Sequence, residues 1–188
     1  MKERVFIVHR WGATPKDDWY FWLKKELETQ NYEVHIPAMP NTDEPEISAW
    51  VNTLKKSVKK CDNATHFVGH SIGCQTIMRY VEESKEQCGN IVFVAGWFYL
   101  KNLESKAVVK IAQPWLETPV DTGKVRENCQ GITVFLSEND PYNCIEENKK
   151  AFKERLAAKV IIEPEKGHFT AEDKVTKVSE VVRALDLW

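Results

Sequence analysis

The chain has 188 residues, a formal net charge of −2 and 29% charged residues, a composition typical of a globular protein with one sizeable core. It has no basic stripe and no apolar run near the roughly 20 residues of a membrane span, so we expect neither nucleic-acid nor membrane partners. Its five cysteines are widely spaced and include no C-x-x-C pair, which argues against a zinc site and against a disulfide framework.

Short apolar, β-branched runs alternate with helical patterns along the chain. Strands are predicted at 5–8, 32–36, 65–69, 90–94, 132–136 and 160–162. Helices are predicted at 17–30, 45–60, 72–86, 146–157 and 171–186. This order predicts one α/β domain over 1–188, with a mostly parallel sheet of about six strands and helices on both faces. Because the first strand begins at Val5, we expect no signal peptide and a cytoplasmic protein.

The alternation of strands and helices is lost between Gly96 and about residue 130. This segment contains aromatic residues and prolines, namely Trp97, Phe98, Tyr99, Pro114, Trp115 and Pro119. Long segments at the carboxyl ends of parallel strands often form lids or pocket walls. We therefore predict a lid or pocket segment over 97–130. The alternative is a surface helix that packs its aromatic side chains on the body of the protein.

The sequence Gly69-His70-Ser71-Ile72-Gly73 lies between a predicted strand and a predicted helix. A G-x-S-x-G pattern at such a junction is typical of a nucleophile elbow. A side chain at either glycine would collide with the crossing backbone. The turn would hold the serine hydroxyl at the helix N-terminus, whose free N–H groups suit an oxyanion. The pattern therefore predicts Ser71 as a nucleophile.

A nucleophilic serine needs a neighbouring base, which is usually a histidine. Of the five histidines, His168 follows the last predicted strand on a loop with a preceding glycine, so it can reach the sheet edge. His35 and His66 lie inside predicted strands, and His70 points away from the serine, so we expect structural roles for them. His9 ends the first predicted strand. We therefore predict His168 as the base.

The base needs a carboxylate to orient it, and this acid should follow the preceding strand. Glu138 and Asp140 both follow the strand at 132–136. We favour Asp140 because the proline after it fixes the local backbone at a turn. Asp121, in the irregular segment, is a third candidate.

The order Ser71, Asp140, His168 is that of α/β-hydrolases. Five segments resemble a family of small α/β-hydrolases: Val8-His9-Arg10-Trp11, Trp19-Tyr20-Phe21-Trp22-Leu23, the elbow at 69–73, Asp140-Pro141-Tyr142 and Gly167-His168-Phe169. This is the retinoblastoma-binding serine hydrolase family, which includes esterase-like bacterial members. The resemblance spans nearly the whole chain, and it implies an α/β-hydrolase-like three-layer sandwich.

The resemblance also implies roles for individual residues. Ser71 would be the nucleophile, His168 the general base and acid, and Asp140 the group that orients the imidazole. The backbone N–H groups of Ile72 and Trp11 would form the oxyanion hole, and neither a metal nor an organic cofactor would be needed. Arg10 departs from the pattern, since the family has glycine there. It could alter the turn before Trp11, face the pocket and favour an anionic substrate, or face solvent.

The aromatic residues Trp11, Trp97, Phe98 and Trp115 suggest an apolar acyl pocket, and we place His9 and Arg10 at the same pocket. We expect a serine hydrolase that cleaves a small carboxylic ester, or an amide or thioester, through an acyl-enzyme. Acyl transfer to an acceptor other than water would use the same residues. The alternative from another class is a protein-interaction module on a hydrolase scaffold. Nothing in the sequence indicates a protein partner, and an intact set of site residues argues against this alternative.

Overall fold

The structure, a computed structural model, describes residues 2–185. One parallel sheet has the strand order β2-β1-β3-β4-β5-β6. Its strands are β1 (Arg4–Val8), β2 (Glu33–His35), β3 (Thr65–His70), β4 (Cys88–Val94), β5 (Cys129–Ser137) and β6 (Lys159–Glu163). The helices are α1 (Tyr20–Thr29), α2 (Ile47–Val58), α3 (Ile72–Glu82), α4 (Lys106–Glu117), α5 (Thr122–Glu127), α6 (Ile145–Leu156) and α7 (Ser179–Leu185). The predicted α/β architecture and its six strands are confirmed.

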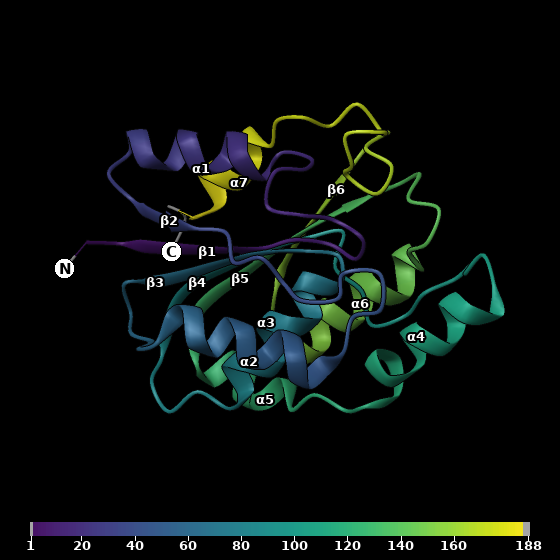
Figure 1. Ribbon diagram of the computed structural model, residues 1–188, viewed down its shortest axis with the longest axis horizontal. Helices are drawn as coiled ribbons and strands as arrows, with labels where there is room; N and C mark the ends of the chain where they lie inside the picture. Colours follow the sequence, from purple (N-terminus) through teal and green to yellow (C-terminus); the bar gives the residue numbers. More distant parts are fainter. Residues whose placement is uncertain (1, 186–188) are drawn as a thin grey trace.

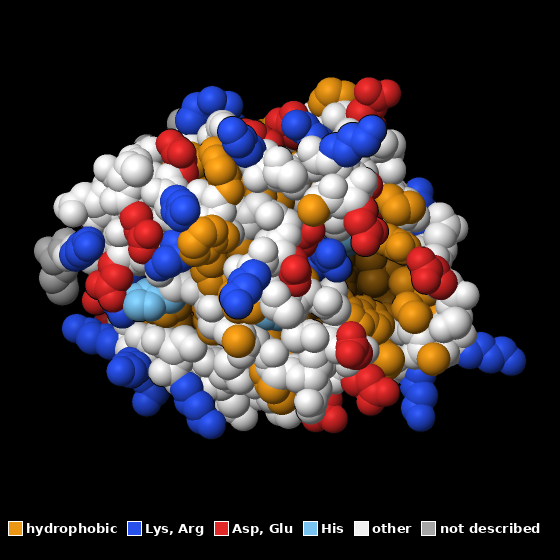
Figure 2. Space-filling model, turned by 45° about the horizontal axis from the view of Figure 1, so that its top comes forward, with side chains coloured by type: hydrophobic (Ala, Val, Ile, Leu, Met, Phe, Trp, Pro, Cys, Tyr) orange, Lys and Arg blue, Asp and Glu red, His pale blue; other side chains and the backbone are white. Residues whose placement is uncertain are grey.

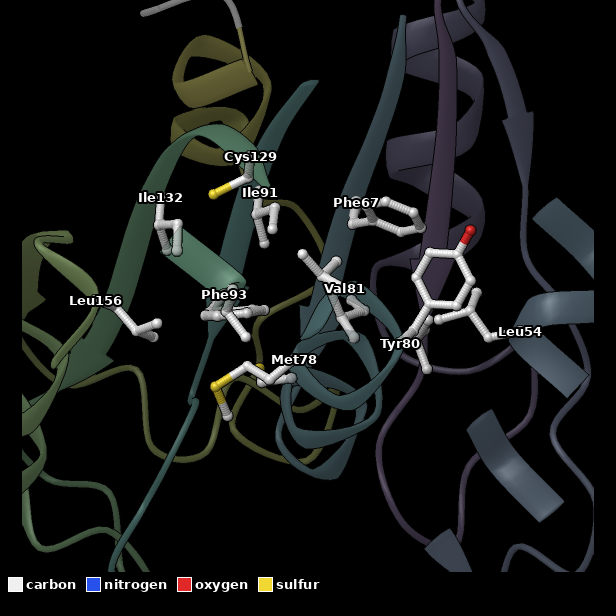
Figure 3. Close-up of a cluster of buried hydrophobic side chains, with 14 of the residues drawn as sticks. Leu54, Phe67, Met78, Tyr80, Val81, Ile91, Phe93, Cys129, Ile132 and Leu156 are labelled. Atoms are coloured by element: carbon white, nitrogen blue, oxygen red, sulfur yellow. The ribbon is translucent and has the colours of Figure 1, made fainter. Parts of the chain in front are cut away.

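Helices cover both faces of the sheet and bury its apolar side chains in two clusters. Figure 1 shows α1 and α7 on one face, and α2, α3, α5 and α6 on the other. Because side chains alternate along a strand, β1 sends Val5 and Ile7 to the first cluster and Phe6 and Val8 to the second. Figure 3 shows part of the second cluster, where Phe67, Ile91 and Phe93 of the strands face α3, which contributes Met78 and Val81. No helix within residues 2–185 is long and apolar enough to cross a bilayer.

Two glycines allow α3 to approach the sheet closely. A Cβ atom on Gly73 would lie 2.2 Å from the carbonyl oxygen of Val8 in β1. A Cβ atom on Gly69 would lie 2.8 Å from backbone atoms of Cys74 in α3. Backbone atoms cannot yield as a flexible side chain would, so both positions require glycine. The steric prediction made for the elbow is therefore confirmed.

Replacing Gly73 by alanine is expected to lower the free energy of unfolding by about 3 kcal/mol or more, because the new methyl group overlaps the β1 backbone. Urea denaturation followed by circular dichroism measures this change. Gly123→Ala in α5 is the matched control, since its Cβ would meet the movable end of the Asp121 side chain at 3.2 Å. Equal stability of Gly73→Ala and wild type would show that α3 does not approach β1 so closely.

The last helix is shorter than predicted. The periodicity predicts 171–186, whereas α7 begins at Ser179, and residue 186 lies outside the described residues. The Asp173 carboxylate accepts hydrogen bonds from the backbone N–H groups of His168 and Thr170 and from the Thr170 hydroxyl, which holds this stretch as turns. The apolar positions of the pattern are nevertheless buried: Val175, Val178, Val182 and Leu185.

The segment 97–130 contains two helices, α4 and α5. Figure 1 shows α4 beyond the carboxyl ends of the strands, at the margin of the molecule. The side chains of Ala112 and Trp115 on α4 are buried. The buried guanidinium of Arg79 donates to the carbonyl oxygens of Trp115 and Thr118, at 3.0 and 2.8 Å, and so binds the carboxyl end of α4. The segment thus has features of both alternatives, since α4 packs Trp115 on the body while Trp97, Leu100, Leu103 and Val108 line a pocket.

Candidate active site

The loops that carry the predicted site residues meet at the carboxyl edge of the sheet. Strand β1 lies beside β3, with Val8 opposite Gly69. From β1 the chain continues to β2 at one side, and from β3 it continues to β4 at the other, so the two loops diverge and leave a crevice between them. The turn after β1 and the elbow after β3 border this crevice. The loops after β5 and β6 approach it from the side of β4.

The elbow holds Ser71 in a strained conformation, with φ 53° and ψ −118°. Such a backbone conformation costs about 1–3 kcal/mol in a residue other than glycine and persists only where the surroundings enforce it. Here the Ser71 N–H donates to the carbonyl oxygen of Val94 at 2.9 Å, while the tight glycine contacts hold α3 in place. The Ser71 Oγ lies 2.9 Å from His168 Nε2 and 3.4 Å from Trp97 Nε1. The Ser71 oxygen therefore lies within hydrogen-bond distance of the His168 imidazole and accepts from the Trp97 indole N–H.

A carboxylate follows the imidazole in the same line. His168 Nδ1 lies 2.8 Å from Asp140 Oδ2. The other oxygen, Asp140 Oδ1, accepts from the backbone N–H groups of Tyr142 at 3.0 Å and Asn143 at 3.3 Å. The Asp140 side chain is completely buried, whereas Glu138 is exposed. The structure thus brings together Ser71, His168 and Asp140, and it leaves Glu138 and Asp121 away from the imidazole.

Short-range contacts fix the loop that carries His168. Gly167 has φ +53°, and its N–H donates to Asn139 Oδ1 at 2.7 Å. A Cβ atom on Gly167 would lie 2.1 Å from Asp173 Oδ1. Asp173 Oδ2 in turn accepts from the His168 N–H at 2.9 Å. The glycine before His168 therefore does more than make the loop flexible, because it leaves room for the carboxylate that holds the His168 backbone.

Two backbone N–H groups, those of Trp11 and Ile72, are expected from the sequence to bind an oxyanion. Within residues 2–185, the N–H groups of Trp11 and Ile72 have no hydrogen-bond acceptor. Ile72 is the first residue of α3, and the Trp11 indole donates to the Asp43 carbonyl at 3.0 Å, which fixes its turn. Both N–H groups belong to residues that line the same pocket as Ser71. The geometry is consistent with the expected oxyanion hole.

The Arg10 side chain is held beside the turn by two hydrogen bonds. Its Nε donates to Asp18 Oδ2 at 2.8 Å, and its Nη1 donates to the Trp11 carbonyl at 3.2 Å. Burial opposes ionisation of Asp18, but hydrogen bonds from the Ala171 N–H and from Arg10 hold the pKa of this carboxyl below its ordinary value. The guanidinium lines the pocket, yet its charge is already paired with a buried carboxylate.

The pocket above Ser71 has a volume of about 420 Å³. Its walls include Arg10, Trp11, Ser71, Ile72, Trp97, Leu100, Leu103, Glu104, Val108, Pro141, Tyr142, His168, Glu172 and Asp173. Figure 2 shows the hollow on the right of this face, with hydrophobic side chains inside and acidic side chains near its edge. Among residues 2–185 no group of three or more His, Cys, Asp or Glu side chains is arranged to hold a metal ion.

Three residues predicted for the pocket lie elsewhere. His9 is completely buried, where it contacts the Arg10 carbonyl and accepts from the Met39 N–H. Phe98 packs on Phe152, with ring centroids 4.8 Å apart. Trp115 donates its indole N–H to the Pro45 carbonyl beneath α4. Aromatic content suggested Phe98 and Trp115, and His9 was placed there beside Arg10, but neither composition nor position in the sequence reveals which side chains face the cavity. Of the predicted set, Arg10, Trp11 and Trp97 line the pocket.

A family model described as serine hydrolase matches residues 5–187. This chain belongs to the serine hydrolase family. The protein is therefore a hydrolase, as expected from the family motifs in its sequence.

The sequence similarity between this serine hydrolase and its relatives covers nearly the full length of the chain. YdeN of Bacillus subtilis (strain 168) is 26% identical over 190 residues, which cover 98% of this chain and 95% of YdeN. The crystal structure of the B. subtilis ydeN gene product has a TM-score of 0.88 at 25% identity, with 98% and 97% of the two chains covered. The serine hydrolase RBBP9 of Rattus norvegicus is 27% identical over 176 residues, which cover 93% of this chain and 88% of RBBP9. The predicted family resemblance is therefore confirmed.

More distant structures share the fold alone. A structure from work on carboxylesterases of Nitrososphaera gargenis has a TM-score of 0.73 at 11% identity and covers 98% of this chain and 89% of that one. The α/β-hydrolase fold predicted from the motif order is thus confirmed.

Sequence reasoning missed two side chains that shape the site of this serine hydrolase. The Tyr142 ring stands edge-on to His168, with centroids 5.3 Å apart, and its hydroxyl donates to Glu104 at 3.0 Å. This hydrogen bond, together with partial burial, raises the pKa of Tyr142. Asp173 holds the His168 loop. The T-x-x-D spacing of Thr170 and Asp173 is a signal for a local side-chain cap and could have identified that carboxylate. No periodic signal marks Tyr142.

Proposed function

We propose that this serine hydrolase cleaves small carboxylic esters through an acyl-enzyme formed on Ser71. The single observation that supports the proposal best is the continuous chain from Ser71 Oγ through both nitrogens of His168 to the buried Asp140. A serine with an adjacent imidazole, itself oriented by a carboxylate, is the arrangement that activates a hydroxyl for acyl transfer.

Each atom of this chain has a part in the proposed reaction. Ser71 Oγ attacks the ester carbonyl carbon while its proton passes to His168 Nε2. The carbonyl oxygen becomes an oxyanion that accepts from the N–H groups of Ile72 and Trp11. The tetrahedral intermediate collapses, the C–O bond to the alcohol breaks, and Nε2–H protonates the leaving alkoxide. Water then attacks the acyl-enzyme by the same sequence, releasing the carboxylic acid and restoring the Ser71 hydroxyl.

Asp140 has a supporting part. Its carboxylate accepts from Nδ1–H of His168, which leaves Nε2 unprotonated and directed at the serine. The same carboxylate stabilises the imidazolium while the proton rests on Nε2. Both Asp140 oxygens are occupied by donors, so the side chain has a fixed orientation.

The pocket supports a small, largely apolar acyl group as the substrate. A cavity of about 420 Å³ lies near the lower end of the range for small-molecule sites. Trp97, Leu100 and Val108 supply apolar walls close to Ser71. The same chemistry acts on an amide or a thioester when the leaving group fits. Acyl transfer differs only in the acceptor that attacks the acyl-enzyme.

Esters with a negatively charged acyl group are expected to react at least about tenfold more slowly than neutral esters of equal length. Three carboxylates line the pocket, on Glu104, Glu172 and Asp173, whereas the one arginine is paired with Asp18. The comparison of kcat/KM for p-nitrophenyl hexanoate and the p-nitrophenyl monoester of adipic acid measures this preference. Added salt should narrow the difference by screening the carboxylates. Faster reaction of the adipate ester would show that Arg10 is available to an anion.

Fluorophosphonate labelling tests the proposed function directly. We expect the purified protein to acquire one phosphonyl group, on the peptide that contains Ser71, and to hydrolyse short-chain p-nitrophenyl esters. Heat-denatured protein is the control for non-specific labelling. A folded protein that neither labels nor hydrolyses any ester of the series would contradict the proposal and favour a protein-interaction module.

A further inference from the structure

A second hydrogen-bond chain runs behind the site and does not include the nucleophile. The backbone N–H of Arg10 donates to the Tyr20 hydroxyl at 3.0 Å. This hydroxyl lies 2.7 Å from His70 Nδ1, and His70 Nε2 lies 2.8 Å from the carbonyl oxygen of His168. The chain therefore connects the turn before Trp11 to the loop that carries the imidazole.

The direction of each hydrogen bond follows from its end groups. A carbonyl oxygen only accepts, so His70 Nε2 must carry the proton that binds His168. Burial, and then the nearby His168 ring, lower the pKa of His70 to about 3, so its ring is neutral and Nδ1 is an acceptor. Tyr20 must then donate to Nδ1 while it accepts from Arg10. One arrangement of protons satisfies the whole chain.

Packing leaves these side chains little freedom to move. Tyr20 and His70 are both completely buried. The Trp19 ring packs against both of them, with centroids 4.8 Å from Tyr20 and 5.3 Å from His70. The Trp19 indole also donates to the carbonyl oxygen of Phe169, next to His168, at 3.0 Å. A displacement at one end of the chain would therefore be resisted at the other end.

We propose that Tyr20 and His70 are positioning residues, which set the distance between the oxyanion turn at Trp11 and the base His168. This inference rests on the proposed function. The two ends of the chain lie one residue from the expected oxyanion donor and on the base itself. The transition state needs the Trp11 N–H and His168 Nε2 to be aligned with the same reacting carbonyl group, and errors of about 1 Å are costly. Tyr20 and His70 thus act through other residues and do not touch the substrate.

The variant Tyr20→Phe tests this inference, because it removes one hydroxyl and keeps the ring. It leaves the Arg10 N–H and His70 Nδ1 without their buried partner. We expect kcat for a p-nitrophenyl ester to fall about 10-fold to 100-fold with KM nearly unchanged, since the loss affects the transition state more than substrate binding. Affinity for an alkylboronic acid, which mimics the tetrahedral intermediate, should fall in parallel with kcat.

Tyr80→Phe is the matched control. Tyr80 is also a buried tyrosine, but it lies in the last turn of α3 and packs on Phe67 of β3. We expect this control to keep wild-type kcat and boronic acid affinity, even where Tm falls. A decrease in Tm without a decrease in kcat for Tyr20→Phe would overturn the inference and leave Tyr20 with a purely structural role.

A second variant covers the case in which Tyr20→Phe does not fold. In His70→Gln an amide N–H remains as a donor for the His168 carbonyl, but the imidazole Nδ1 that accepts from the Tyr20 hydroxyl is lost. We therefore expect a similar loss of kcat. In the double variant the loss should be smaller than the product of the two single losses, because both act on one chain. Independent, fully multiplicative losses would overturn the inference. If the wild type neither labels nor hydrolyses esters, the proposed function itself fails, whereas an active wild type with unaffected variants refutes the positioning role alone.

Discussion

Ser71→Ala is expected to lower kcat/KM for ester hydrolysis at least about 10⁴-fold and to abolish fluorophosphonate labelling. The variant keeps the backbone of the elbow, the α3 contacts and the pocket, and it removes only the oxygen that His168 and Trp97 contact. Residual turnover would reflect the free N–H groups of Trp11 and Ile72, which can still polarise a carbonyl group. Rates with p-nitrophenyl butyrate, followed at 405 nm, measure the effect.

Ser57→Ala in α2 is the matched control for that variant. Its hydroxyl donates to the Thr53 carbonyl within the helix, and Ser57 does not line the pocket. Activity and labelling of this control should equal those of wild type. Retained labelling of Ser71→Ala at the wild-type rate would mean that another residue is the nucleophile, and the proposed mechanism would be abandoned.

Asp140→Asn should lower kcat by about 10⁴-fold with little loss of stability. The reason lies in the hydrogen bonds that the Asp140 carboxylate accepts. Two backbone N–H groups donate to Asp140 Oδ1, so the amide oxygen of the asparagine must take that position. Its NH₂ group then faces His168 Nδ1, which must become an acceptor, and the proton moves to Nε2. A protonated Nε2 in a neutral ring cannot accept the serine proton.

Glu138→Gln separates this effect from a general loss of negative charge. Glu138 is the second acid candidate from the sequence, but its side chain is exposed. We expect unchanged kcat for Glu138→Gln. A large loss in that variant, combined with a small loss in Asp140→Asn, would reverse the assignment of the acid. Urea denaturation of both variants checks that the folded fraction is the same.

The fold could be predicted because the strands are short, apolar and separated by helical patterns. Ser71, Asp140 and His168 could be placed in the same way, since each follows a predicted strand and parallel strands end at one edge. Sequence reasoning failed where a single tertiary contact determines the residue at which an element begins. The last helix starts late because one carboxylate, that of Asp173, binds the turn before it.

Pocket membership was harder to predict for a related reason. Periodicity identifies which side of an element is buried, but it does not distinguish burial in the core from burial around a cavity. His9 and Trp115 are buried as their sequence context suggests, yet their hydrogen bonds go to Met39 and Pro45 outside the cavity. Nothing in the sequence indicated that Arg10 pairs with Asp18, or that Asp18 adopts φ 47°.

The attachment of α4 to the body has a consequence for how substrate preference can change in evolution. This helix buries Ala112 and Trp115 against the body, while Leu103 and Val108 near its amino end face the pocket. Substitutions at Leu103 or Val108 therefore reshape the cavity while the sheet, the elbow and the His168 loop keep their contacts. Substitutions in this wall can change which substrates fit at little cost in stability, so specificity can diverge faster than the reaction chemistry.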